Sequence, residues 1–74
     1  MTKKYIIKTL EKTLKEYNAL WDRIESLKYT LDDAEDRHDI TTDITGWGCS
    51  EMRDNLTHDI DRLQEAIKNL KQRK

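Results

Sequence analysis

An apolar repeat of seven residues runs without interruption along the first half of this chain. Its steps alternate between four and three residues, and its members are Ile6, Leu10, Thr13, Tyr17, Leu20, Ile24, Leu27, Leu31, Ala34 and His38. Only the threonine and the histidine are not hydrophobic. A repeat of this period keeps one narrow stripe on one side of an α-helix, where it packs against a partner helix. The repeat therefore predicts a long helix that belongs to a coiled coil or a helical bundle.

A second, shorter repeat with the same steps occupies the last third of the chain. Its members are Cys49, Arg53, Leu56, Ile60, Leu63, Ile67 and Leu70. Between the two repeats the helical pattern lapses, and both glycines of the chain, Gly46 and Gly48, fall in this stretch. Ser50 follows as the expected N-cap of the second helix. We predict an all-α, two-helix antiparallel hairpin that forms a single domain over residues 1–74. Its expected elements are a helix over residues 3–37, a loop over residues 38–49 and a helix over residues 50–73.

The size of the chain indicates that this hairpin does not act alone. A chain of 74 residues buries little of its surface, so its core alone gives marginal stability. The single cysteine, Cys49, cannot form a disulfide within the chain and lacks the paired spacing of a zinc site. Folding the hairpin about residue 44 sets Leu70 opposite Asn18, which leaves roughly the first dozen residues of the first helix uncovered.

The residues left uncovered by this folding are not polar. The row Ile7, Leu14 and Trp21 adds a second apolar column beside the main stripe, which is typical of a face that contacts several helices. We expect a second copy to cover this face, so that two hairpins dimerise into a four-helix bundle; a helix from another protein is the rival. The expected oligomerisation residues are Ile6, Ile7, Leu10, Leu14, Tyr17 and Trp21.

Charge is distributed unevenly although the net charge is only −1. Residues 1–28 carry a balance of +3, residues 29–61 a balance of −8 and residues 62–74 a balance of +4. A hairpin brings the two basic segments together at one end and leaves the acidic segment at the turn. The first helix is charged against its dipole, which costs about 0.3 to 1 kcal/mol for each misplaced charge at low salt. Two arrangements explain this layout. One is an antiparallel dimer, in which each acidic turn lies beside the basic end of the other copy. The other is docking of the acidic turn on a cationic groove of another protein.

The acidic turn supplies the candidate partner-binding residues, and we expect their partner to be a basic protein surface. The acids are Asp32, Asp33, Glu35, Asp36, Asp39 and Asp43. Trp47, between the two glycines, either folds back as a lid over the end of the hairpin or is displayed as an interface anchor. The lid is the favoured interpretation because it would shield Leu31, Ala34 and Cys49, and the anchor stays open.

No pattern in the sequence predicts catalysis, a cofactor or a metal ion. His38, Cys49 and His58 are possible metal ligands, but His58 lies about eight residues into the second helix. It is therefore on the order of 12 Å from the other two within one hairpin. Carboxylates are abundant, yet abundance without a pocket is typical of a solvated surface. The basic end, with Tyr5 nearby, is too mixed with acids to predict direct binding of nucleic acid.

The opening segment does not resemble a targeting or membrane signal. Residues 1–8 include basic side chains but an apolar run of only three residues, and no later stretch could span a bilayer. We expect a soluble cytoplasmic protein.

Three resemblances bear on function. Residues 56–63 resemble the signature helix of the Spo0E-type aspartyl-phosphate phosphatases through Ile60 and Asp61, although the characteristic serine-glutamine-glutamate-leucine-aspartate run is missing. This resemblance implies hydrolysis of a response-regulator phospho-aspartate through Asp61. In size and architecture the chain resembles the small hairpin proteins of plasmid copy control. In the separation of its basic end from its acidic turn, the chain is similar to phage-borne inhibitors such as the anti-CRISPR proteins.

These observations lead to one leading hypothesis and two alternatives. The leading hypothesis is a non-catalytic protein-interaction module, a homo-oligomeric hairpin whose acidic turn docks on a basic partner. The first alternative is a phage-type stoichiometric inhibitor of a nucleic-acid-handling enzyme, with acidic side chains that replace phosphates. The second alternative is the phosphatase.

Overall fold

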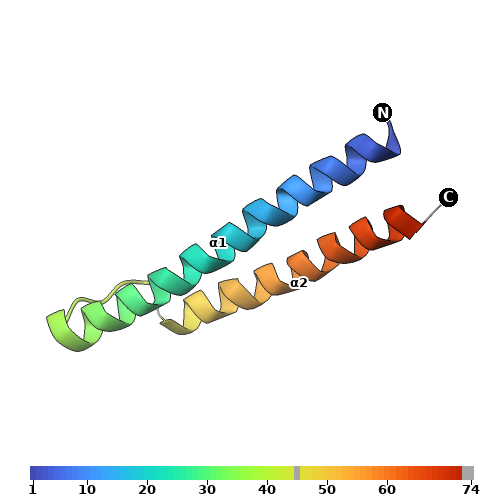
Figure 1. Cartoon of the computed structure of the whole chain (residues 1–74). Helices are drawn as coiled ribbons and strands as arrows, with labels where there is room; N and C mark the ends of the chain where they lie inside the picture. Colours follow the sequence, from blue (N-terminus) through green and yellow to red (C-terminus); the bar gives the residue numbers. More distant parts are fainter. Residues whose placement is uncertain (45, 73–74) are drawn as a thin grey trace.

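The computed structural model describes residues 1–44 and 46–72, and the chain forms a two-helix hairpin. Helix α1 spans Lys3–His38 and helix α2 spans Gly46–Gln72. The helices pack side by side along a rod of 57 × 15 × 14 Å, and both chain ends lie at the same end of it (Figure 1). The predicted all-α hairpin is confirmed. The predicted end of the second helix at residue 73 lies outside the described residues.

The boundaries of α1 match the prediction to within one residue, because each end has a local cap. The Thr2 hydroxyl accepts a hydrogen bond from the Tyr5 N–H at 3.2 Å. At the other end Asp39 adopts the left-handed conformation, with φ 53°, and the Ile40 N–H donates to the Ala34 carbonyl at 3.0 Å. A short polar side chain such as aspartate tolerates this conformation, which closes the helix.

Helix α2 begins four residues earlier than predicted, so the expected loop over residues 38–49 is too long. Ser50 is not the N-cap; it lies inside the helix, and its hydroxyl donates to the Gly46 carbonyl at 3.2 Å. The glycines that suggested a loop are part of the helix. At Gly46 the chain passes close to the Asp32 carboxylate of α1, which a Cβ atom at this position would displace.

Three contacts between the helices set their register, and it differs from the prediction. The pairs are Glu11–Lys71, Trp21–Thr57 and Glu25–Arg53, at 3.5, 3.1 and 3.1 Å. They place the fold of the hairpin near residues 39–41 rather than residue 44, so Leu70 does not lie opposite Asn18. The expectation that the first dozen residues of α1 lie beyond α2 is therefore wrong, since Lys71 reaches Glu11.

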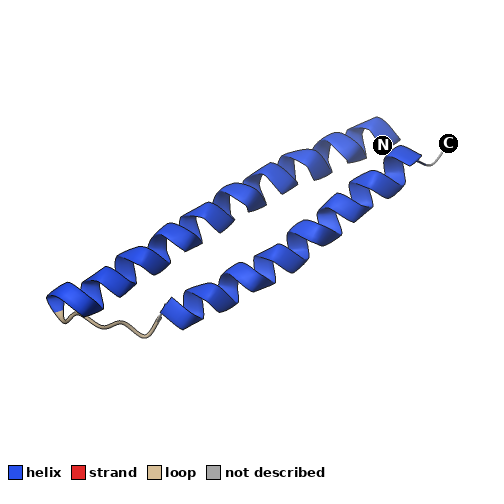
Figure 2. Ribbon diagram, turned by 60° about the horizontal axis from the view of Figure 1, so that its bottom comes forward, coloured by secondary structure: helices blue, strands red, loops and turns tan. Residues whose placement is uncertain are grey.

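The uncovered part of α1 is mainly at the turn. Because α2 starts level with Asp32, the last turns of α1 project past it, and the connecting segment runs back beside them (Figures 1 and 2). This arrangement follows from the early start of α2 at Gly46. The projecting end of α1 carries the acidic turn of the sequence.

Little of the hairpin is buried. Among the described residues only Cys49 and Ile67 are buried, both on α2. Every member of the α2 repeat is buried or half-buried, which confirms that this repeat faces α1. The chain exposes 6152 Å², whereas a compact protein of 8.9 kDa would expose about 4,800 Å². The excess, about 1,300 Å², means that the single hairpin has almost no closed core.

The apolar side of α1 is wider than the surface that α2 covers. Three neighbouring columns run along it, each with a period of seven residues. The column of Ile7, Leu14 and Trp21 is half-buried, and so is the column of Leu10, Tyr17, Ile24 and Leu31. The third column, which we call the outer stripe, comprises Ile6, Thr13, Leu20, Leu27 and Ala34. Its three large side chains are exposed, with relative exposures of 36% for Ile6, 43% for Leu20 and 38% for Leu27.

Candidate functional site

Five exposed acids form what we call the acidic end of the hairpin. They are Asp33, Glu35, Asp36, Asp39 and Asp43. Asp33 is paired with Arg37 at 3.1 Å, one helical turn further along. Among the described residues, the other four acids have no salt bridge. Residues 32–44 hold six acids and one arginine, a net charge of −5 with histidine neutral. The structure thus places five of the six predicted partner-binding acids, all of them exposed, at the projecting end of the hairpin.

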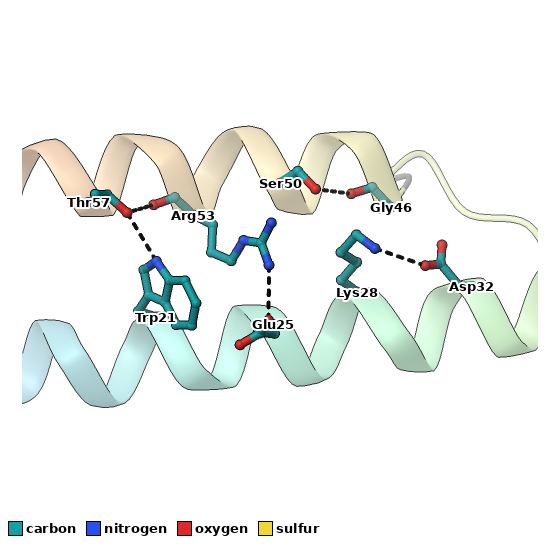
Figure 3. A network of polar contacts seen from close by, with 8 residues as sticks. All are labelled: Trp21, Glu25, Lys28, Asp32, Gly46, Ser50, Arg53 and Thr57. Atoms are coloured by element: carbon teal, nitrogen blue, oxygen red, sulfur yellow. Dashed lines mark hydrogen bonds and ion pairs between the residues drawn. The ribbon is translucent and has the colours of Figure 1, made fainter.

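Asp32, the sixth predicted acid, is placed differently. It is half-buried, its carboxylate accepts a hydrogen bond from Lys28 at 3.3 Å, and the same carboxylate lies against Gly46 (Figure 3). Gly46 is the first residue of α2, where the helix dipole favours a negative charge. The position of Asp32 therefore suits a role in holding the start of α2 more than a role in binding a partner.

Reversing the charge of Asp32 should cost more than reversing that of its neighbour. We expect Asp32→Lys to lower the free energy of unfolding by about 1 to 2 kcal/mol, because it puts a cation beside Lys28 and at the positive end of α2. Asp33→Lys makes the same change in net charge and also breaks the ion pair with Arg37, one helical turn further along, but it lies on an exposed site and should cost about 0.5 kcal/mol. Urea unfolding followed by circular dichroism, at one chain concentration, measures the difference. Equal losses would show that Asp32 has no special role.

The favoured interpretation of Trp47 as a lid is wrong, because its side chain is 75% exposed. The early start of α2 explains this. Trp47 lies in the first turn of the helix, two residues before the fully buried Cys49, and two residues turn a helix by about 200°. The turn that buries Cys49 against α1 therefore directs Trp47 away from it. The alternative, Trp47 as an interface anchor, stays a prediction.

Trp47 also begins a row of exposed polar residues that sequence reasoning missed. This outer row of α2 comprises Trp47, Glu51, Asp54, His58 and Asp61, with steps of four and three residues. Its period places all five on one side of the helix. The signal is present in the sequence, but it becomes visible only when α2 is known to include Trp47.

A polar network joins the two helices midway along the hairpin (Figure 3). The Arg53 guanidinium donates to Glu25 at 3.1 Å and lies 5.3 Å from the centre of the Trp21 ring. The Trp21 indole N–H donates to the Thr57 hydroxyl at 3.1 Å. Arg53 and Glu25 are both partly shielded from solvent, so this network fixes the register of the hairpin more firmly than a surface pair would.

The residues considered for chemistry lie apart. Cys49 has no exposed surface, which confirms its interpretation as a small residue of the α2 stripe. His58 and Asp61 are exposed on the outer row, and His38 is exposed at the end of α1. Within residues 1–44 and 46–72, no three histidine, cysteine, aspartate or glutamate side chains are grouped so that they could hold a metal ion.

Most of the predicted oligomerisation residues are half-buried within the single chain. Ile7, Leu10, Leu14, Tyr17 and Trp21 are half-buried, and of the predicted set only Ile6 is exposed. The physical reason is the rotation of α1, which turns the column of Ile7 toward α2. The outer stripe is an apolar surface of α1 that stays available.

Comparison with known proteins adds no further identification. No family model, no curated protein and no solved structure matches the chain. In the described part of the chain, neither helix has a stretch apolar enough to cross a lipid bilayer.

Proposed function

We propose that this chain is a non-catalytic protein-interaction module that works as a homodimer and docks on a basic protein surface through its acidic end. The observation that carries the proposal is the exposure of Trp47, which is 75% exposed in the first turn of α2, at the same end of the hairpin as the projecting acids. Large aromatic side chains are enriched among the residues that dominate binding energy at interfaces. A tryptophan displayed at this position suits an anchor.

The charge of the acidic end supports a basic partner. A net charge of −5 over residues 32–44, on an end that projects past α2, attracts cationic surfaces and raises the rate of encounter with them. Four of its five acids have no salt bridge within the described residues, so they keep their charge free for a partner. Binding should therefore weaken as salt concentration rises.

The exposed surface supports self-association. Each hairpin exposes about 1,300 Å² more than a compact chain of its mass, and a standard interface buries about 800 Å² on each partner. Two hairpins that form a four-helix bundle would remove much of this excess. Assembly also places opposite charges near the unfavourably charged ends of α1.

Affinity capture from lysate of the source organism tests the docking proposal, with the full chain as bait. We expect Trp47→Ala to reduce the captured partner at least about tenfold, because loss of an interface anchor costs 2 kcal/mol or more. Neutralising Glu35, Asp39 and Asp43 to their amides should have a similar effect. Tyr5→Ala removes an aromatic side chain that is 58% exposed at the other end of the hairpin and should leave capture unchanged. Equal capture by all variants, with unchanged helicity, contradicts the proposal.

A second candidate function has one observation in its favour. The outer row of α2 extends the negative surface from Trp47 to Asp61, a length of about 20 Å. Such a line of carboxylates suits an inhibitor of a nucleic-acid-handling enzyme, in which the acids take the place of phosphates. In that case duplex DNA should compete with the chain for its captured partner. Absence of competition favours the more general interaction module.

A further inference from the structure

The outer stripe of α1 carries large apolar side chains that the hairpin leaves exposed. Ile6, Leu20 and Leu27 are exposed there, and Thr13 and Ala34 complete the period of seven residues. Leu20 lies at the middle of the stripe, midway between Ile6 and Ala34, and also at the middle of the helix Lys3–His38. A shallow surface hollow adjoins it, lined by Glu16, Ala19, Leu20 and Arg23.

We propose that a second copy of this chain covers the outer stripe, with the two α1 helices antiparallel and a two-fold axis at Leu20. The proposal rests on the homodimer proposed above and assigns its face and orientation. A two-fold axis at this point sets Leu20 against Leu20 of the partner subunit. It also sets Ile6 level with Ala34 of the partner subunit, so the two helices overlap along their whole length.

The charges of α1 select the antiparallel orientation. With the axis at Leu20, the lysine-rich residues 4–8 of one copy lie level with residues 32–36 of the partner subunit, which carry the acids. A parallel arrangement would place lysines beside lysines and acids beside acids, which is repulsive. The charge layout that is unfavourable for an isolated α1 becomes favourable in this dimer.

A specific pair of charges flanks the axis. Glu16 and Arg23 line the hollow beside Leu20, and within the described residues neither has a salt-bridge partner. Seven residues separate them, about 10 Å along one helix, so they cannot pair with each other inside one chain. The two-fold axis brings Glu16 of each copy to within one residue, about 1.5 Å along the helix, of the level of Arg23 of the partner subunit, which allows two equivalent ion pairs.

The self-complementarity of this face favours a second copy over a foreign helix. The positions of the stripe are spaced symmetrically about Leu20, whereas the charge along α1 changes sign about the same residue. An identical helix turned by 180° satisfies both features at once. The face is also part of a surface excess of about 1,300 Å² per chain, which exceeds the roughly 800 Å² that each partner buries in a standard interface.

Cysteine cross-linking tests the geometry. Under mild oxidation Leu20→Cys should form a disulfide-linked dimer, because position 20 meets its own copy at the axis. Ile6→Cys and Leu27→Cys should each stay unlinked alone, while a mixture of Ile6→Cys and Ala34→Cys should link. The wild-type chain, with its fully buried Cys49, and the outward variant Lys15→Cys are the controls. Self-linking of Ile6→Cys would indicate a parallel dimer and overturn the proposal.

Charge exchange at Glu16 and Arg23 gives a test that keeps the apolar stripe intact. Sedimentation equilibrium of the full chain should give a dimer, twice the 8.9 kDa of one chain. Glu16→Arg and Arg23→Glu should each weaken dimerisation about tenfold through like-charge contacts, and the double exchange should restore it to within about threefold. Lys15→Glu and Asp22→Arg, with the same spacing on the exposed outward side, are the matched controls.

The outcomes separate the two proposals. The chain could form a dimer in which the double exchange at Glu16 and Arg23 restores nothing and position 20 does not link. That result overturns the assigned face and leaves the homodimer proposal intact. A wild-type chain that stays a helical monomer at tens of micromolar overturns both, and a different protein would then be the occupant of the stripe. Dimerisation that is restored only by the double exchange establishes the assigned geometry.

Discussion

Replacing Ile67 by alanine should unfold most of the protein. Ile67 is the larger of the two buried side chains, with 8% of its surface exposed, and its loss leaves a cavity between the helices. Truncation of a buried isoleucine to alanine costs about 2 to 5 kcal/mol. A small chain of this kind has only a few kcal/mol of stability in total. The expected result is a large loss of helical circular dichroism at 25 °C, measured at the same chain concentration as the wild type.

A matched substitution separates this effect from a general response to loss of isoleucine. Ile40 lies in the connecting segment and is 55% exposed, so Ile40→Ala should cost less than about 0.5 kcal/mol. Thermal unfolding of both variants gives the comparison. If Ile67→Ala retains full helicity and a wild-type melting temperature, the contact between the helices near their open end does not hold the hairpin together.

Replacing Trp21 by alanine should have the second largest effect, about 2 to 4 kcal/mol. The substitution removes the half-buried ring between the helices, the hydrogen bond to Thr57 and the surface on which Arg53 stacks. It also leaves the Arg53–Glu25 pair without its packing support. Urea unfolding followed by circular dichroism measures the change in free energy.

Two controls resolve what Trp21 contributes. Trp21→Phe keeps most of the ring and loses the indole N–H, so it should cost about 1 kcal/mol. Trp47→Ala removes the same side chain from a site that is 75% exposed and should leave stability within about 0.5 kcal/mol of the wild type. Equal losses for Trp21→Ala and Trp47→Ala would contradict the assignment of one tryptophan to the hairpin and the other to a partner.

The structure separates residues that hold the hairpin from residues that are free to bind. Asp32, Arg53 and Trp21 contact the opposite helix, whereas Trp47 and the acids of the acidic end are exposed. Variants that test binding should therefore leave Asp32 unchanged. Charge reversal at Asp32 would confuse loss of a partner with loss of the start of α2.

Several features of the fold could be predicted because they depend on local chemistry. The length of α1 follows from its unbroken repeat. The inward side of α2, with Cys49 buried, follows from the period of its own repeat. The acidic end follows from a cluster of carboxylates near the turn, since charged side chains stay in water.

Three other features depend on contacts between the helices and could not be read from the chain. Helix α2 begins at Gly46, where the chain passes close to Asp32, although glycine has a low helix propensity. The sequence does not determine the register of the two helices, because a repeat of seven residues packs almost equally well after a shift along the helix. The contacts of Arg53 and Trp21 select one register.

The sequence also does not determine how α1 is rotated about its own axis relative to α2. Three neighbouring columns of α1 are mainly apolar, and a single partner helix can cover only two of them. The choice of which column stays exposed is therefore made by packing, and it leaves Leu20 at the surface.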